Sequence, residues 1–275
     1  MIKSIEKRSI LKDRAKGALT GRYRQYILTS VVAFLMTLFI RSIVEFTASM
    51  ASSACLLATN PQLALLSTDQ MLELFQSPDF QNNLSTFYRL IYYVLYTISQ
   101  IFTSLFTVGT LYISLKIACG MRFTLSDLFI AYRRNFGKLF CVATVYVLLN
   151  QLYAIPSFLL GGIDYRSEIP LRETGILLAS LLFGALIYTM IYLNLSQVFF
   201  LSMDFPNLRT RDWFQKSIQM MRGHRFRFLL LELSFFPLML LSLLTLGIGD
   251  LWLTPYMQVT SALFYLNLMQ INTAS

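Results

Sequence analysis

The chain has 275 residues, of which 56% are hydrophobic and 13% are charged, and its mean hydropathy is +0.58. Ordinary soluble domains carry about a quarter charged residues, so this composition argues against a soluble protein and predicts an integral membrane protein. The net charge of +9 does not indicate nucleic-acid binding, because the cations fall in clusters beside apolar runs. The three cysteines lie far apart, without the spacing of a disulfide framework or a zinc site.

The N-terminal segment, residues 1–25, is strongly basic and contains only two acidic residues, Glu6 and Asp13. Its apolar residues fall roughly along one side of a helix, namely Ile2, Ile5, Leu11, Ala15, Ala18 and Leu19. We therefore predict a cytoplasmic helix that lies in the membrane interface. The apolar run that follows, 26–44, is longer than that of a secretory signal and predicts a retained first span.

The next segment, 45–86, contains no lysine or arginine but four acidic residues, Glu45, Asp69, Glu73 and Asp79. Because lysine and arginine are concentrated in cytoplasmic loops, we predict that this segment is an extracellular loop. A second apolar run, 90–117, predicts the second span. Capping residues at Thr124–Asp127 then predict a short cytoplasmic helix at 128–134, followed by a third span at 139–160.

A fourth span is predicted at 175–203, and the polar segment 204–227 follows it. In that segment the apolar residues recur at intervals of three and four, on the opposite side from the cations: Trp213, Phe214, Ile218, Met221 and Phe226. This pattern predicts a cytoplasmic amphipathic helix whose aromatic side enters the acyl boundary of the membrane. The alternative is a solvated cytosolic helix.

Two further apolar runs, 228–246 and 251–270, predict the fifth and sixth spans, joined by a turn at Gly247–Asp250. Basic and acidic loops alternate along the chain, which places both termini in the cytoplasm. The predicted fold is all-α: one polytopic membrane domain over 1–275, with six transmembrane helices in three hairpins. A basic surface segment with a glycine precedes each hairpin, which indicates a weak internal repeat.

The cytoplasmic cations are candidates for contact with anionic lipid headgroups, because lysine and arginine next to a span are attracted to the negatively charged leaflet. These candidates are Arg133, Arg134, Lys138, Arg211, Lys216, Arg222, Arg225 and Arg227.

Polar residues within spans are costly and are the default candidates for function. Glu232 lies about one and a half turns inside the fifth span, where it could snorkel, pair with Arg225 or serve a substrate or proton. Asn150 with Gln151 in the third span, and Asn194 with Gln197 in the fourth, are deeper amide pairs. Such amides act either as interhelical hydrogen-bond partners or as ligands.

No catalytic constellation is present in the sequence. The single histidine, His224, stands between Arg222 and Arg225, which makes it a poor general base, and no nucleophile is identifiable beside it. We therefore predict that the protein is not an enzyme and needs no cofactor or metal. Three prolines within spans predict kinks, at Pro156, Pro237 and Pro255.

Several segments resemble a bacterial membrane family known as domain of unknown function 975. The similarity is carried by Met220–His224, Leu233–Phe235, Leu244–Gly249 and Leu251–Tyr256, by Leu125–Phe129 with Asn135–Gly137, and by Ala15–Gly21. The resemblance implies a multi-spanning membrane protein of Firmicutes-type bacteria. It implies no established activity.

Two hypotheses for the function follow. The first is a multi-pass protein of the bacterial plasma membrane that moves, or helps to move, a small or lipid-like substrate, because it combines repeated hairpins, kinked spans and buried polar residues. The alternative is a membrane interaction module, a scaffold, sensor or immunity-type protein, that binds anionic lipid or a protein partner. The expected partners are the lipid bilayer, anionic lipids and a protein partner or a second copy of the chain, and not nucleic acid.

Overall fold

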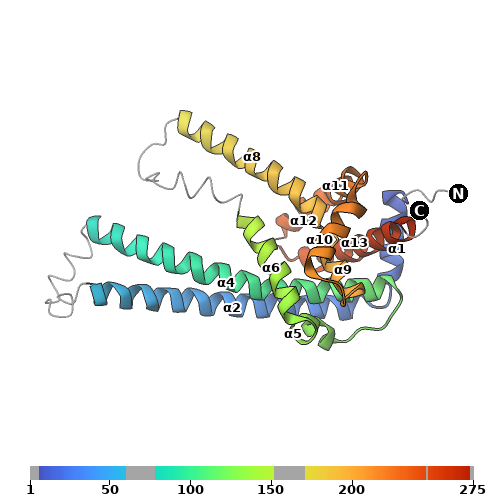
Figure 1. Ribbon diagram of the computed structural model, residues 1–275, viewed down its shortest axis with the longest axis horizontal. Coiled ribbons are helices and arrows are strands. Elements are labelled where there is room, and N and C mark those ends of the chain that lie inside the picture. The colour runs from blue at the N-terminus through green and yellow to red at the C-terminus, as the bar shows by residue number, and fades with distance from the viewer. Residues whose placement is uncertain (1–5, 60–77, 152–170, 246, 273–275) are drawn as a thin grey trace. The chain divides into compact units, whose positions relative to one another are not determined.

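The computed structural model describes residues 6–59, 78–151, 171–245 and 247–272. All regular secondary structure in these ranges is helical (Figure 1). The helices are α1 (Arg8–Leu19), α2 (Tyr23–Thr59), α4 (Pro78–Ala118), the 3₁₀ helix η2 (Leu125–Phe129), α5 (Ile130–Arg133), α6 (Phe136–Gln151), α8 (Leu171–Leu195), α9 (Val198–Asp204), α10 (Thr210–Met221), α11 (Arg225–Leu233), α12 (Phe236–Leu244) and α13 (Asp250–Asn272).

Four stretches are long and apolar enough to cross a membrane: Tyr23–Ala51, Ile91–Ala118, Leu181–Asp204 and Arg225–Leu244. They correspond to the first, second, fourth and fifth predicted spans, so the prediction of an all-helical protein with apolar, membrane-type helices is confirmed. The described part of the third span, α6, ends at Gln151, and α13 is not among the four stretches. Six spans and the orientation of the termini stay predictions.

The predicted extracellular loop at 45–86 needs correction at both ends. Helix α2 continues fifteen residues past the predicted end of its span, to Thr59, and α4 already begins at Pro78. The extension contains neither glycine nor proline, and its short polar side chains bond back to the helix: the Thr47 hydroxyl donates to the Val44 carbonyl and Ser53 to Ser49. The span was predicted to end at residue 44 because the residues that follow are less apolar. The helix continues because the extension contains no helix-breaking residue.

The described chain divides into two compact units, 34–103 and 1–33 with 104–275. In the first unit, Arg41 of α2 pairs with Glu45 one turn later, at 3.1 Å between Nε and Oε1. The Arg41 guanidinium also lies 6.0 Å from the ring centroid of Tyr96 on α4, and Tyr96 stacks on Tyr92. These contacts give a cation within the candidate span Tyr23–Ala51 partners on both α2 and α4.

In the second unit, α1 packs against α13. Leu11, Ala15 and Leu19 are fully buried in that contact, whereas Ile10 on the other side of α1 is exposed. The apolar side that was predicted to enter the membrane interface is therefore covered by protein in this part of the chain. Apolar spacing identified the buried side of the helix correctly but could not tell whether lipid or protein covers it.

The same correction applies to α10. Trp213 and Met221, predicted to enter the acyl boundary, are completely buried against the protein, and the Trp213 indole N–H donates to the Phe205 carbonyl at 2.9 Å. Helices α8 and α9 pack against α10, and every residue from Val198 to Ser202 of α9 is buried. Only Phe226, which lies beyond α10, stays largely exposed, at 67%.

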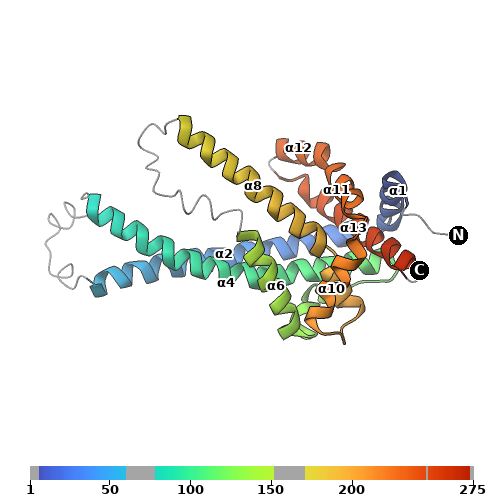
Figure 2. The ribbon, with the colours of Figure 1, turned by 45° about the horizontal axis from the view of Figure 1, so that its top comes forward.

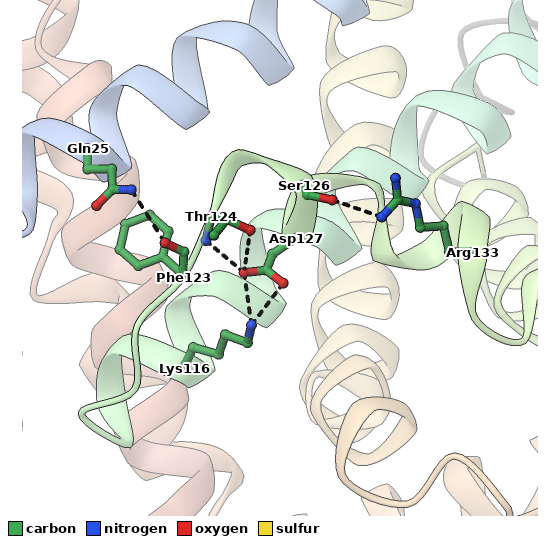
Figure 3. Close-up of polar contacts among 7 residues, drawn as sticks. All are labelled: Gln25, Lys116, Phe123, Thr124, Ser126, Asp127 and Arg133. Atoms are coloured by element: carbon green, nitrogen blue, oxygen red, sulfur yellow. Dashed lines mark hydrogen bonds and ion pairs between the residues drawn. The ribbon is translucent and has the colours of Figure 1, made fainter.

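The connection after α4 is fixed by polar contacts (Figure 3). Both carboxylate oxygens of Asp127 accept hydrogen bonds from Lys116 at 2.8 Å, and one of them also accepts from the Thr124 backbone N–H at 2.8 Å. Thr124–Asp127 thus forms the predicted cap, but the helical segment begins at Leu125 as η2 and continues as α5, instead of one helix at 128–134. Gly109 of α4 allows the close approach of η2, because a Cβ there would lie 2.0 Å from the Leu128 carbonyl oxygen.

Two predicted spans are interrupted within this unit. The fourth breaks at Ser196–Gln197, between α8 and α9, and the fifth breaks at Ser234–Phe235, between α11 and α12. Pro237 lies in the first turn of α12, directly after this second break, which agrees with the predicted kink. Figure 2 shows α12 and α13 beside each other, joined by a turn in which Gly247 has a positive φ of 84°.

Candidate functional site

The break between α8 and α9 begins with side chains that bond back to the helix. The Asn194 amide donates to the Met190 carbonyl at 2.6 Å, and the Ser196 hydroxyl donates to the Leu193 carbonyl at 3.1 Å. Such local bonds compete with continuation of the helix, and Gln197 then serves as the N-terminal cap position of α9. The last carbonyls of α8 consequently need other donors.

Two hydroxyl groups from other helices supply these donors. Ser217 of α10 donates to the Asn194 carbonyl at 2.7 Å, and Tyr146 of α6 donates to the Leu195 carbonyl. Ser217 is fully buried, and the ring of Tyr146 stacks on that of Phe199 at 4.5 Å between centroids. Because freed backbone groups are expensive inside a membrane, these bonds make the break a stable feature of the fold.

Glu232 of α11 faces the same region. Its Oε1 atom accepts a hydrogen bond from the Tyr192 hydroxyl of α8 at 3.0 Å. Among the described residues no lysine or arginine forms an ion pair with Glu232, so the pairing with Arg225, one of the alternatives left open for this residue, is not formed there. A carboxylate near the start of an apolar span is therefore held by a neutral donor.

Two amide oxygens at the α8–α9 break lack hydrogen-bond partners. They are Oδ1 of Asn194 and Oε1 of Gln197, both buried. Gln197 is completely buried, and its amide nitrogen donates only to the neighbouring Ser196 hydroxyl at 2.9 Å. Buried polar atoms are nearly always paired in native proteins, so two such oxygens within one and a half turns of Tyr192 mark a place that lacks a donor.

We call Tyr192, Asn194, Gln197 and Glu232 the α8–α9 site. Its carboxylate and the two amide oxygens without partners are acceptors. Such a set suits a small cation or a solute rich in N–H or O–H groups, and it is poorly suited to an anion. In the described ranges no group of three or more histidine, cysteine or acidic side chains could hold a metal ion.

Comparison with known proteins agrees with the motifs quoted above. The model of the family described as protein of unknown function (DUF975) matches residues 1–272. The chain belongs to the DUF975 family. No curated protein and no solved structure matches it. The resemblance found in the sequence is thus confirmed over nearly the whole chain, and the α8–α9 site lies within the matched region.

Sequence reasoning found three of the four residues at the site of this DUF975 protein. Tyr192 was missed, although its spacing of four from Tyr188, on which it stacks, would place two tyrosines on one helical face within an apolar span. The predicted Asn150 is exposed at the end of α6, and no described contact links it to the site. Gln151 is the last described residue of α6, and its role stays a prediction.

The candidate headgroup cations of this DUF975 protein differ in their surroundings. Six of them are exposed: Arg133, Arg134, Arg211, Lys216, Arg222 and Arg227. The Lys216 ammonium lies 5.1 Å from the Phe205 ring centroid, and Arg133 donates to the Ser126 hydroxyl at 2.8 Å. Lys138 is engaged by the protein, because its ammonium donates to the Leu208 carbonyl at 3.0 Å and to Pro206 at 3.3 Å. Arg225 is half-buried, and its Nε has no partner.

Proposed function

We propose that this DUF975 protein is a non-enzymatic, multi-spanning protein of the plasma membrane that transports a small solute or assists its transport. The supporting observation is the α8–α9 site, which combines a carboxylate held by a tyrosine of the last turn of α8 with two buried amide oxygens without partners at the break that follows. Polar groups of this kind inside membrane helices characterise substrate and ion pathways. Interrupted helices are also a recurring feature of transporter binding sites.

The chemistry of the site favours a cationic or donor-rich substrate. Glu232 would supply the charge, and the amide oxygens of Asn194 and Gln197 would accept hydrogen bonds or coordinate a cation. Small inorganic cations, ammonium and short amines fit this description. Among lipid-like substrates, one with an amine headgroup fits it.

The proposal is tested by ligand-dependent thermal unfolding of the purified protein. A ligand that binds only the folded state raises its stability by about 2.7 kcal/mol at a hundred times the dissociation constant. We expect at least one class among alkali cations, ammonium, alkylamines and polyamines to raise the unfolding midpoint of the unaltered protein. Glu232→Gln should abolish this rise, because the amide keeps an acceptor for Tyr192 but removes the charge.

Glu45→Gln is the matched control, since Glu45 is an exposed carboxylate on another candidate span. It should leave the ligand-dependent rise unchanged. An absence of stabilisation by every class, or an equal rise in the Glu232→Gln variant, would contradict the proposal.

The alternative function, a membrane interaction module, is favoured by a different observation. Most of the candidate headgroup cations are exposed and hence available to a partner, including Arg211 and Arg222 at the two ends of α10. Partner capture by in-membrane crosslinking tests it. A discrete protein partner that is lost in the Arg211→Gln, Arg222→Gln double variant would favour the module, and an unchanged crosslinking pattern would argue against it.

A further inference from the structure

A cavity of about 790 Å³ opens between α1 and α11, with Phe264 of α13 also in its lining. Four cations are among its lining residues: Lys7, Arg8, Lys12 and Arg227. None of the residues of the α8–α9 site lines this cavity, so what it binds can be examined independently of the proposed transport function.

The positive charge of the cavity is not balanced from within its own lining. Glu6 is the only carboxylate among the lining residues, and both of its oxygens accept from Arg14, outside the lining, at 2.8 Å. Arg8 and Lys12 donate to backbone carbonyls, of Leu230 at 3.2 Å and Ser234 at 2.9 Å. These bonds fix the two side chains and leave them further N–H donors for an anion.

The surroundings of Lys12 agree with an unbalanced cluster. Burial, followed by the neighbouring charges of Lys16 and Arg8, lowers the pKa of the Lys12 ammonium below its ordinary value. A bound anion would offset this repulsion.

The other lining residues are mainly apolar. Leu11, Leu231 and Phe264 are among them, and each is almost completely buried. The lining follows α11 from Arg227 to Ser234, which is about 10 Å along the helix axis at 1.5 Å per residue. This stretch belongs to the candidate span Arg225–Leu244, and cations accompany it along its length, since Arg8 bonds to Leu230 and Lys12 bonds to Ser234 at its far end.

A free phosphate would use only the cations of such a cavity. A phospholipid would use both the cations and the apolar side chains of the lining, because its phosphate meets the cations and its glycerol and first acyl carbons meet the leucines. We propose that the cavity between α1 and α11 binds the headgroup of an anionic phospholipid in the leaflet that faces α1. The lipid would also join α1 to α11, next to the interruption of the fifth span.

Native mass spectrometry of the purified protein with added phosphatidylglycerol or phosphatidylcholine tests this site. We expect tighter binding of phosphatidylglycerol, and about tenfold weaker binding in the Arg8→Gln, Lys12→Gln double variant, since each cation near an anionic headgroup strengthens binding severalfold. Lys16→Gln is the matched control on the same helix, outside the cavity, and should change the affinity less than twofold.

A second variant keeps all four cations but fills the space. Ser9 lines the cavity and is exposed, so Ser9→Trp should reduce phosphatidylglycerol binding without unfolding the protein. Thermal unfolding in detergent verifies that each variant is folded. Equal affinity for the two lipids, unchanged binding in both variants, or displacement of the lipid by equimolar inorganic phosphate would overturn the proposal.

Discussion

The two interrupted spans of the second unit satisfy their free carbonyls in different ways. At the α8–α9 break the donors are neutral hydroxyls, from Ser217 and Tyr146. Near the α11–α12 break the donors are cations of α1: Lys12 donates to the Ser234 carbonyl, and Arg8 adds a second bond to the Leu230 carbonyl, which also accepts from the Ser234 N–H. The first break is surrounded by packed helices, whereas the second borders an open cavity.

This difference shows how the donor chemistry sets what each break can bind. Neutral hydroxyls complete the backbone bonds without adding charge, so the acceptors of the α8–α9 site keep an unopposed negative character. Cationic donors complete the same kind of bonds but leave net positive charge, which suits an anion. The two breaks thus use different hydrogen-bond donors for their backbone carbonyls. The groups beside them therefore favour ligands of opposite charge.

The largest expected loss of stability comes from removing a buried side chain of α10, the helix that supports the α8–α9 break. Trp213→Ala should destabilise the protein by about 3–5 kcal/mol, because it empties a fully buried site under the helix that carries Ser217. Thermal unfolding in detergent measures this change. Trp252→Ala is the control, since Trp252 is half exposed, and it should cost much less. Equal losses in the two variants would show that α10 does not depend on the packing described above.

Removal of the hydroxyl donors should have an intermediate effect. Ser217→Ala and Tyr146→Phe should each cost about 1–3 kcal/mol, because each leaves a buried carbonyl without its donor. Ser53→Ala removes an exposed hydroxyl that bonds within its own helix, and it should cost less than about 0.5 kcal/mol. If the buried and exposed variants unfold at the same midpoint, the carbonyls at the first break have other donors.

Loss of a cation at the second break should matter less in neutral detergent and more in anionic lipid. Arg8→Gln should lower stability by less than about 1 kcal/mol in neutral detergent, because the bond to Leu230 is exposed. With phosphatidylglycerol present, the difference between the variant and the unaltered protein should grow. A difference independent of the lipid would separate the second break from lipid binding.

The smallest expected effect is a change in how the stability of the protein depends on pH. Burial, followed by the charge of Arg227, lowers the pKa of His224 at the beginning of α11. A histidine with a lowered folded-state pKa favours the neutral form, so its contribution to stability is present above its ordinary pKa of about 6.5 and is lost as the pH falls through the folded value. His224→Gln should therefore lose less stability between pH 7 and 5 than the unaltered protein. Identical pH profiles would contradict this assignment.

Much of the fold could be predicted from the sequence because apolar length and loop charge are local properties. The spans around α2, α4, α8 and α11, the cap at Asp127 and the turn at Gly247 all depend on residues close together in the chain. The apolar faces of α1 and α10 were identified correctly, but they were predicted to contact lipid. Only tertiary packing decides what covers an apolar face.

The candidate site was predictable in part for the same reason. Charged and amide residues stand out within an apolar span, which is how Glu232, Asn194 and Gln197 were found. Tyr192 and Tyr146 do not stand out, since aromatic residues are common in such spans, and their roles depend on contacts 40 and 49 residues away in the chain. The basic cavity was missed because α1 and α11 are separated by more than two hundred residues and only the fold brings them together.

The most direct test of the central claim is cysteine accessibility in native membranes. Cys55, Cys119 and Cys141 would be replaced, and single cysteines would be placed along Leu186–Gln197 and Phe228–Leu240. A membrane-impermeant thiol reagent should then label positions periodically, along the faces that carry Tyr192 and Glu232, to mid-membrane depth. Labelling confined to the ends of both segments would contradict an α8–α9 site that a solute reaches from water.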